Sequence, residues 1–241
     1  MNDLKGRKAI VTGGNRGIGY AIAEELIHQG AKVMITGKNE DQLAEAAKKL
    51  SASYRVLEMR DVSHFESFVA LAAEQLGGLD LLVNNAGVVT SSDRNGIEAL
   101  TEEDWDVTLD INLKGVFFLT RAVASHMKAH NVKGRIVNLC SNTGFRPATM
   151  AYATSKWALR GLTMGMGRAY ARDGIILNGI APGPTSTRLM FAEDGETFNR
   201  SDIPIGRYSY PQEIAKLAAF LLSDTVGNIV GEVLVADGGE P

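Results

Sequence analysis

Cysteine is almost absent from this sequence of 241 residues, in which Cys140 is the only one. A single cysteine cannot form an intrachain disulfide, so a reducing compartment is the simpler assumption and we expect a cytoplasmic protein. Long apolar stretches are missing as well, because no run approaches the ~20 residues that a membrane-spanning helix needs. The residues after Met1 lead into only a few apolar positions, unlike a secretion signal. We therefore expect no membrane association.

An excess of either charge is also missing. The chain has 25 lysines and arginines against 28 aspartates and glutamates, a formal net charge of −3. This balance gives no basic surplus to attract nucleic acid, so we expect no nucleic-acid partner. The four histidines are scattered without metal-ligand spacing, and we expect no metal site. With 45% hydrophobic and 22% charged residues, the composition is that of an ordinary globular protein with a sizeable core.

Three reactive side chains occur close together in the sequence: Ser141, Tyr152 and Lys156. If residues 152–165 are helical, Tyr152 and Lys156 stand four positions apart on one face and reach the same small volume. A phenol titrates near pH ~10 in water, and a neighbouring ammonium lowers that pKa. Ser141 would hydrogen-bond an oxygen that exchanges a proton with the phenol, which is the chemistry of an alcohol–carbonyl pair. The alternative interpretation is a half-buried tyrosine beside a solvated lysine.

The first forty residues have the pattern of a strand, a glycine turn, a helix and a second strand. Such a βαβ unit presents free backbone amides at the start of its helix, where a phosphate binds. The glycines of the turn permit a tight bend and a close backbone approach. Their spacing is Gly-x-x-x-Gly-x-Gly rather than the commoner Gly-x-Gly-x-x-Gly. The turn is formed by Gly13, Gly14, Asn15, Arg16, Gly17, Ile18 and Gly19.

The end of the second strand indicates which dinucleotide binds. An NAD-selective chain places an acidic residue there to bind the ribose hydroxyls. Here Gly37 and Lys38 occupy that point, and Arg16 lies inside the glycine turn. Two cations and no carboxylate favour a 2′-phosphate, so we expect NADP(H) rather than NAD(H). Glu40 and Asp41 follow, but they suit the first turn of the next helix.

Strand and helix patterns alternate to the end of the chain, without an internal repeat or a linker. Such alternation predicts an α/β protein, a single-domain doubly wound Rossmann fold over 1–241 with a seven-stranded parallel sheet and helices on both faces. We expect strands at 8–12, 32–36, 54–59, 79–83, 135–140, 175–180 and 232–236. We expect helices at 18–30, 40–50, 64–76, 101–130, 152–171 and 211–223.

Taken together, the motifs resemble the short-chain dehydrogenase/reductase family along essentially the full length. They are Thr12-Gly13-x-x-x-Gly17-Ile18-Gly19, Asp61-Val62, Asn84-Asn85-Ala86-Gly87, Asn112, Ser141, Tyr152-x-x-x-Lys156, Pro182-Gly183 with Thr187, and Asp237-Gly238-Gly239. The resemblance implies that Tyr152 is the general acid/base, that Lys156 lowers its pKa and holds the nicotinamide ribose, and that Ser141 orients the substrate oxygen. It implies that Asn112 keeps a water between Lys156 and solvent.

The same resemblance implies the remaining cofactor contacts. Asp61 and Val62 would border the adenine, Asn84 and Gly87 the adenosine ribose, and Thr187 the carboxamide, with Ala86, Pro182, Gly183 and Thr185 beside them. The chain departs from the family pattern at Cys140, where serine is frequent, at Tyr208, where glycine is frequent, and in a shorter link from Ser141 to Tyr152.

Three stretches are expected to select the substrate: the loops 88–98 and 142–151 and a lid at 188–205. Their candidate wall residues are mostly apolar, which favours a hydrophobic or cyclic ketone. These residues are Val88, Val89, Phe145, Met150, Leu189, Met190 and Phe191.

Three functions remain open at this stage. The first is an NADP(H)-dependent enzyme that interconverts a ketone and a secondary alcohol. The second is a 3-oxoacyl-thioester reductase, suggested by Ile203-Pro204-Ile205-Gly206-Arg207, with Lys128, Lys133 and Arg172 facing an acidic carrier protein. The third is an NADP(H)-binding sensor without turnover. Apolar faces on helices 101–130 and 152–171, together with the resemblance, lead us to expect a homotetramer.

Overall fold

One parallel sheet organises the protein. The computed structural model describes residues 4–187 and 199–240. Its seven strands lie in the order β3-β2-β1-β4-β5-β6-β7, so the predicted doubly wound Rossmann fold is confirmed. The order reverses between β1 and β4, because the chain fills one side of β1 first and then crosses to the other. The strands are β1 (Lys8–Thr12), β2 (Lys32–Gly37), β3 (Ser53–Val56), β4 (Leu81–Asn84), β5 (Arg135–Leu139), β6 (Ile176–Pro182) and β7 (Val233–Ala236).

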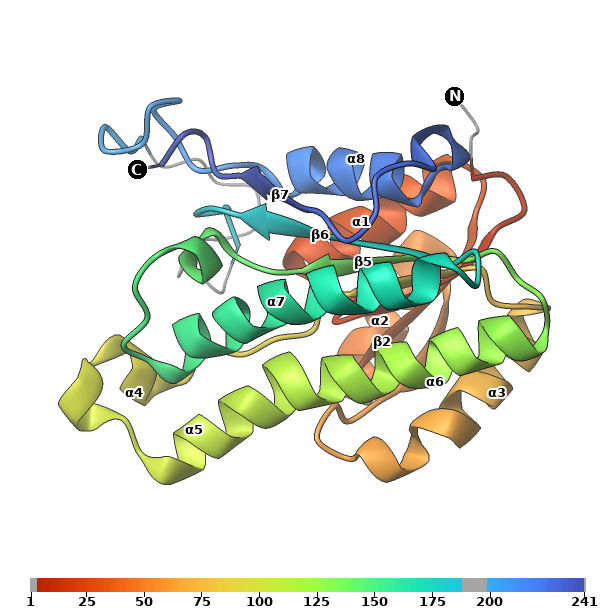
Figure 1. Ribbon diagram of the computed structural model, residues 1–241, viewed down its shortest axis with the longest axis horizontal. Helices are drawn as coiled ribbons and strands as arrows, with labels where there is room; N and C mark the ends of the chain where they lie inside the picture. The colour runs from red at the N-terminus through yellow and green to blue at the C-terminus, as the bar shows by residue number, and fades with distance from the viewer. Residues whose placement is uncertain (1–3, 188–198, 241) are drawn as a thin grey trace.

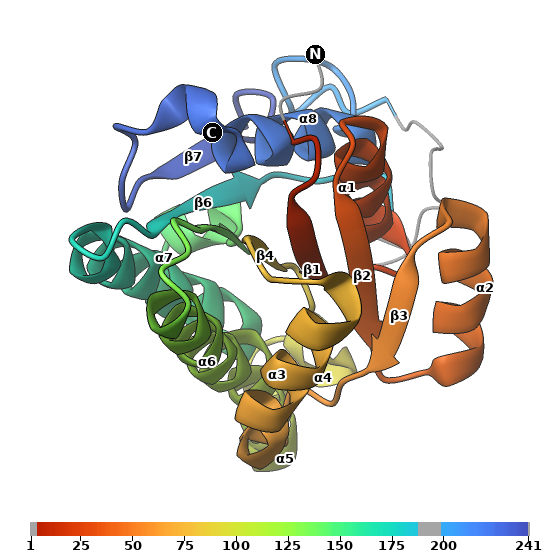
Figure 2. The same ribbon diagram turned by 90° about the vertical axis from the view of Figure 1, so that its right-hand side faces the viewer.

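Helices cover both faces of the sheet (Figures 1 and 2). Helices α1, α2 and α8 pack on one face and share a core with Leu26, Leu43 and Ile214. Helices α3, α6 and α7 pack on the other, around Phe68 and Val123. The helices are α1 (Gly17–His28), α2 (Glu40–Leu50), α3 (Phe65–Leu76), α4 (Ser91–Arg94), α5 (Glu102–Leu109), α6 (Val116–Ala129), α7 (Ala151–Ala171) and α8 (Pro211–Leu222).

The single helix expected at 101–130 is interrupted. A π-helical turn, η3 (Asp110–Gly115), separates α5 from α6. A π-turn inserts an extra residue into the helix, and such insertions are frequent at functional sites. This one turns the side chain of Asn112 fully into the interior. Gly115 is required at its end, because a Cβ there would lie 2.4 Å from the carbonyl oxygen of Met59.

Other boundaries differ by a few residues from the expected ones. The third strand ends at Val56 instead of continuing to 59, and residues 57–60 line a cavity described below. The stretch 88–100, expected to be irregular, contains the short helix α4. None of the helices within the described residues is both long and apolar enough to cross a membrane.

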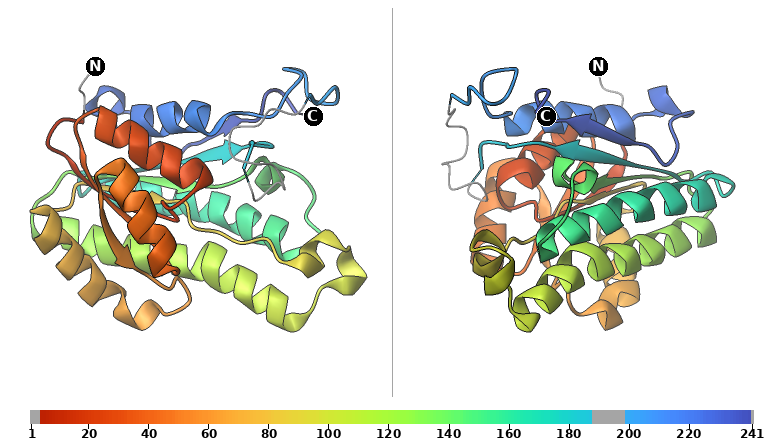
Figure 3. Two further views of the ribbon diagram at one scale, coloured as in Figure 1. Left: turned by 180° about the vertical axis from the view of Figure 1, so that it is seen from behind. Right: turned by 60° about the vertical axis from the view of Figure 1, so that its left-hand side comes forward.

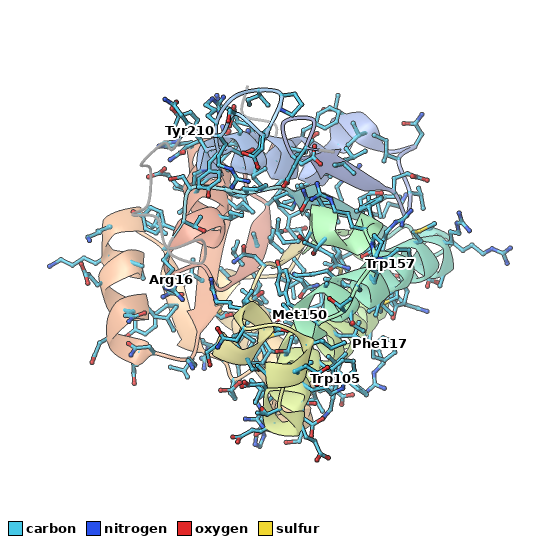
Figure 4. All side chains as sticks on the ribbon, turned by 90° about the vertical axis from the view of Figure 1, so that its left-hand side faces the viewer. Arg16, Trp105, Phe117, Met150, Trp157 and Tyr210 are labelled. Carbon is cyan, nitrogen blue, oxygen red and sulfur yellow. The ribbon has the colours of Figure 1, made fainter. Side chains whose placement is uncertain are left out.

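Because all strands are parallel, their carboxyl ends meet at one edge of the sheet. The loops after β1, β4, β5 and β6 therefore gather there, together with α4 and the start of α7 (Figures 1 and 3). Figure 4 views this edge, with Arg16 on the side of α1 and α2 and Trp157 on the side of α7. Ligands of open α/β sheets bind at this edge.

Candidate active site

The glycine turn after β1 forms one end of a cavity of about 510 Å³. Gly13 and Gly17 have φ angles of 63° and 56°, a backbone region that favours glycine. Helix α1 then starts without a side-chain cap and without an acidic residue in its first turn. Its first amide groups are therefore free to bind an anion, and no negative side chain competes for them. The residues of this turn and its surroundings fit a dinucleotide pyrophosphate.

Cations line the far end of the same cavity. Arg16 and Lys38 both lie on its wall, as predicted, and Arg60 joins them. Arg60 is 3.8 Å from a carboxylate oxygen of Asp110. Within the described part of the chain, Arg16 and Lys38 have no ion-pair partner. Two uncompensated positive charges beside a dinucleotide cavity fit a 2′-phosphate.

A second cavity of about 430 Å³ continues from the first. Ile18, Asn85, Gly87 and Thr187 line both, so the two form one continuous cleft. Ser141, Tyr152 and Lys156 all line the second cavity, which makes it the candidate reaction chamber. Expected cofactor residues lie along this cleft: Asn15, Arg16, Gly17 and Ala86 in the first cavity, Pro182, Gly183 and Thr185 in the second, and Ile18, Gly87 and Thr187 in both.

Tyr152 and Lys156 lie on one face of α7, as their spacing predicts. The Lys156 Nζ is 5.6 Å from the centre of the Tyr152 ring. Lys156 is 5% exposed, and its ammonium donates a hydrogen bond of 2.7 Å to the carbonyl of Leu139. Burial lowers the pKa of Lys156 to about 8. The lysine therefore stays charged at neutral pH, close to the phenol but not bonded to it.

Ser141 is placed to donate its proton toward the cavity. Its Oγ accepts hydrogen bonds from the amide of Thr143 (3.2 Å) and from the Thr143 hydroxyl (2.9 Å). With both acceptor positions filled, its own O–H is directed at another acceptor. Ser141 and Tyr152 both line the chamber, and the serine hydroxyl lies near enough to the phenol to oppose the rise of its pKa. An oxygen between them would contact both.

The pKa of Tyr152 differs from the expected direction. Burial raises the pKa of the phenol, and the hydrogen bond from Ser141 opposes this only in part. The lowering of the Tyr152 pKa expected from Lys156 is not seen, and the Lys156 ammonium is hydrogen-bonded to the Leu139 carbonyl. The phenol is therefore protonated at neutral pH and suited to donate a proton. Cys140 next to it is buried, and burial raises its pKa too, so it acts as a small packing residue.

Asn112 connects the π-turn to two other elements. Its amide donates to the carbonyl of Val88 (2.9 Å), and the amide of Val88 donates back to its Oδ1 (2.9 Å). Its Nδ2 also lies 3.2 Å from the Ser155 Oγ on α7. These bonds fix the β4 loop against α7. The expected role of Asn112, to keep a water between Lys156 and solvent, stays a prediction.

Several expected cofactor residues lie outside the cleft. Asn84 is 1% exposed and its amide donates to Thr120 and Asn138, so it is a core residue. Its neighbour Asn85 lines the cleft instead, with its Nδ2 bonded to the carbonyls of Thr12 (2.8 Å) and Gly13 (3.1 Å).

Three further residues expected to bind the cofactor also lie outside the cavities: Asp61, Val62 and Gly19. Asp61 caps the turn that follows it by accepting from the amide of Ser63, and the wall beside it is formed by residues 57–60 rather than by Asp61 and Val62. Gly19 lies outside the cavity, and a Cβ there would be 2.3 Å from the Gly13 carbonyl. Gly19 is therefore needed for the close packing of α1 on the turn.

The walls of the reaction chamber contain charged groups as well as apolar ones. Of the candidate wall residues, Val89 lines the reaction chamber and Val88 lines the cofactor cavity. Met150 lines neither, and Phe145 packs outward, with the Arg160 guanidinium 3.9 Å from its ring centre. Leu189, Met190 and Phe191, and much of the lid expected at 188–205, lie outside the described residues. Charged residues that the sequence analysis missed line the chamber instead: Arg94, Arg146, Arg200 and Glu240.

A buried carboxylate at the start of α7 was also missed. Asp93 on α4 is 3% exposed, and its Oδ1 accepts a hydrogen bond of 3.3 Å from the amide of Tyr152. An acceptor at a helix N-terminus satisfies an otherwise free amide and complements the helix dipole. Asp93 thus fixes the turn that carries the phenol, and no local sequence pattern connects two residues 59 positions apart.

Known proteins resemble this chain over its whole length. Residues 7–196 match the family model described as short chain dehydrogenase. Gluconate 5-dehydrogenase of Gluconobacter oxydans is 36% identical over 98% of this chain and 95% of its own. A 3-oxoacyl-acyl-carrier-protein reductase of Vibrio cholerae is 35% identical over 98% of both. A short chain dehydrogenase from Burkholderia cenocepacia, solved in complex with NADP, is 33% identical, covers 99% of both chains and superposes with a TM-score of 0.87.

Proposed function

The chain belongs to the short-chain dehydrogenase family, and from this premise we propose that it interconverts a ketone and a secondary alcohol with NADP(H), Tyr152 acting as the general acid/base. That it is an oxidoreductase of CH–OH groups follows from its relatives. The observation that supports the finer proposal is the joint presence of Ser141, Tyr152 and Lys156 in one chamber that continues into the dinucleotide cavity.

The protein's own groups would act as follows. The Ser141 O–H hydrogen-bonds the substrate oxygen and holds it against the phenol. In the reductive direction the Tyr152 phenol gives its proton to that oxygen, and in the oxidative direction the phenolate takes the proton from the alcohol. Bound NADP(H) would supply the hydride to, or accept it from, the substrate carbon that carries this oxygen. Lys156, charged at neutral pH and 5.6 Å from the ring centre of Tyr152, would hold the ribose of the nicotinamide.

NADP(H) is proposed over NAD(H) because Arg16 and Lys38 line the cavity and form no ion pair with a carboxylate among residues 4–187 and 199–240. The loops 88–98 and 142–151 supply walls of the chamber through Val89, Arg94 and Arg146, which supports their part in substrate selection within a single domain. A hydrophobic or cyclic substrate stays a prediction, because Arg94, Arg146, Arg200 and Glu240 line the chamber besides Lys156.

A Tyr152→Phe variant tests the chemistry. It removes only the hydroxyl, and general acid/base catalysis contributes about 10²–10⁴-fold, so we expect ketone reduction to fall by at least 100-fold. Binding of NADPH, measured by its fluorescence, should stay within a few-fold. Tyr170→Phe is the matched control, because Tyr170 is a half-buried tyrosine on the same helix outside the chamber. Full activity of Tyr152→Phe with cofactor bound would refute the mechanism.

A second candidate function is reduction of 3-oxoacyl thioesters on a carrier protein. It is favoured by the Vibrio cholerae relative, at 35% identity. Of the three basic residues expected to face the carrier, Lys128 forms an ion pair of 2.9 Å with Asp173, which weakens that surface. Carrier-linked 3-oxoacyl substrates assayed beside simple ketones would separate the two functions. A rate on the thioesters at least 100-fold higher would favour the second.

We also propose a homotetramer in the cytoplasm. Trp105 (39% exposed) and Trp157 (44% exposed) show large aromatic surface on α5 and α7, and Phe117 lies between them in the sequence on α6 (Figure 4). Large exposed aromatic groups on neighbouring helices are typical of subunit contacts. The molecular mass in solution tests this, and a monomer would contradict it.

A further inference from the structure

Helix α7, which carries Tyr152, is capped from outside. The residue before the helix, Met150, makes no side-chain cap, and the first turn contains no acidic residue. The cap comes instead from Asp93 on α4, whose Oδ1 accepts a hydrogen bond of 3.3 Å from the Tyr152 amide. A residue of the loop 88–98 therefore holds the turn on which the phenol stands.

Asp93 is fixed in its buried position. It is 3% exposed. Its Oδ2 accepts a hydrogen bond of 3.4 Å from the Thr90 hydroxyl, so that both oxygens accept, as those of an ionised carboxylate do. The next helix holds α4 as well, because the Ser92 hydroxyl donates to the Asp104 carboxylate on α5. The negative charge of Asp93 is thus fixed in place and largely removed from water, where charges act more strongly than at the surface.

The groups that act on the Tyr152 phenol come from three elements. At the end of β5, the Ser141 hydroxyl lowers the pKa of the phenol, and a Cys140 thiolate would raise it. Burial raises the pKa of Cys140 itself, so its thiol is neutral at pH 7. On α7, the Lys156 Nζ is a cation 5.6 Å from the ring centre. Within the described residues, Asp93 on α4 is then the charged group that raises the pKa of Tyr152 at neutral pH.

The walls of the chamber carry further charges of both signs. Arg94 follows Asp93 on α4 and lines the chamber, and its guanidinium keeps its positive charge at any working pH. A cation there favours a phenolate, as Lys156 does, and so acts against Asp93. The remaining wall charges lie in two ion pairs, in which opposite signs largely cancel: Arg146 with Glu240, and Arg200 with Asp202.

We propose that Asp93 is a positioning residue: it fixes the turn of Tyr152, and its charge opposes the phenolate, which biases the site toward ketone reduction. This inference rests on the proposed function, in which Tyr152 is the acid and the base. Reduction starts from the protonated phenol, whereas oxidation of an alcohol starts from the phenolate. A fixed carboxylate near the phenol therefore keeps the form that reduces ketones populated and makes the form that oxidises alcohols rarer.

The pH dependence of alcohol oxidation tests this. The best alcohol of a panel with cyclohexanol and 2-butanol is oxidised at saturating NADP⁺, and kcat/KM is followed against pH for the wild type and Asp93→Asn. Asparagine keeps an acceptor for the Tyr152 amide and removes the charge. Because Asp93 contacts the backbone of Tyr152 and not its hydroxyl, we expect the midpoint to fall by about 0.5–1 pH unit. The ratio of oxidation to reduction at pH 7 should rise about three- to tenfold.

Two further variants separate charge from folding. Asp93→Ser is a second uncharged variant with a shorter acceptor, and it should lower the midpoint as Asp93→Asn does. Asp104→Asn is the matched control, because it removes a carboxylate from the same hydrogen-bonded network without touching Tyr152, and it should leave the midpoint unchanged. NADPH binding, measured by fluorescence, shows that each variant is folded.

A titration without cofactor or substrate gives an independent readout. The tyrosinate absorbance of the protein minus that of its Tyr152→Phe counterpart reports the pKa of Tyr152 directly, and this pKa should be lower in Asp93→Asn than in the wild type. A midpoint and a pKa that neither uncharged variant lowers, or that Asp104→Asn lowers equally, would overturn the inference and leave the proposed function standing. Absence of turnover by the wild type with every alcohol and ketone tested would instead refute the proposed function.

Discussion

Lys38 gives the sharpest test of the cofactor assignment. It lies at the end of β2 on the wall of the dinucleotide cavity, and it is exposed. Replacing it by glutamine keeps a long polar side chain and removes one positive charge. Since NADPH and NADH differ only in the 2′-phosphate, the substitution should weaken NADPH binding and leave NADH binding unchanged.

The magnitude follows from the surroundings of Lys38. A hydrogen bond to a charged group is worth about 1.5–3 kcal/mol. Because Lys38 is exposed, and exposed ion pairs contribute about 0–1 kcal/mol, the loss should lie near 1–1.5 kcal/mol. That is roughly a five- to tenfold rise in the Kd for NADPH, at 1.4 kcal/mol per factor of ten. Arg16 also lines the cavity and should keep the remaining preference, so Arg16→Gln in addition should remove most of it.

Titration of the cofactor's fluorescence measures both Kd values. The effect should shrink in 1 M salt, where the Debye length is about 3 Å. Lys48→Gln is the matched control, because Lys48 is an exposed lysine in the last turn of α2 and outside the cavity. If Lys38→Gln changes the two Kd values by the same factor, or Lys48→Gln has an equal effect, the two-cation argument fails.

Two further predictions concern α7. Gly167→Ala would place a Cβ 2.5 Å from the Cα of Gly231 and 2.7 Å from the Leu177 carbonyl, whereas at Gly165 nothing lies within 4 Å. We expect Gly167→Ala to lower the free energy of unfolding by about 1–3 kcal/mol and the Tm by roughly 3–10 °C. We expect Gly165→Ala to leave the protein as stable as before or to stabilise it by up to about 1 kcal/mol. Equal Tm values for the two variants would contradict this. Burial lowers the pKa of Lys156 from 10.5 to about 8, so the folded protein releases this proton at lower pH than the unfolded chain. The unfolding free energy of the wild type, measured by urea denaturation, should therefore rise relative to that of Lys156→Met between pH 8 and 10.5, by about 3 kcal/mol in all. A difference between the two proteins that does not change with pH would contradict this.

Much of the fold was predictable because its signals are local. The alternation of apolar strands with amphipathic helices determined the layers, and the glycine turn needs residues that adopt positive φ, as Gly13 and Gly17 do. The proximity of Tyr152 and Lys156 follows from helical spacing alone. The cations Arg16 and Lys38 line one cavity, because each is adjacent to a turn that the pattern located.

The parts that the sequence did not predict depend on non-local contacts. The π-turn at Asp110–Gly115 leaves the apolar pattern of 101–130 intact, so periodicity alone indicates one helix. Asn84 and Asn85 are chemically identical neighbours. Their side chains point in opposite directions at the end of the strand, and only the structure shows that Asn85 is the one that faces the cleft. Glu240 meets Asn142 across 98 positions, and no spacing rule connects them.

The direction of the Tyr152 pKa shift bears on how the site works. A phenol whose pKa is raised by burial is protonated at neutral pH, so it is ready to donate a proton in ketone reduction. Oxidation of an alcohol needs the phenolate, which this environment disfavours, and the nearest positive charge, Lys156, is itself bound to the Leu139 carbonyl. The free energy of forming the phenolate therefore enters the barrier for oxidation and not that for reduction. It follows that kcat for oxidation should rise with pH while kcat for reduction stays flat or falls over the same range, provided that Tyr152 transfers the proton.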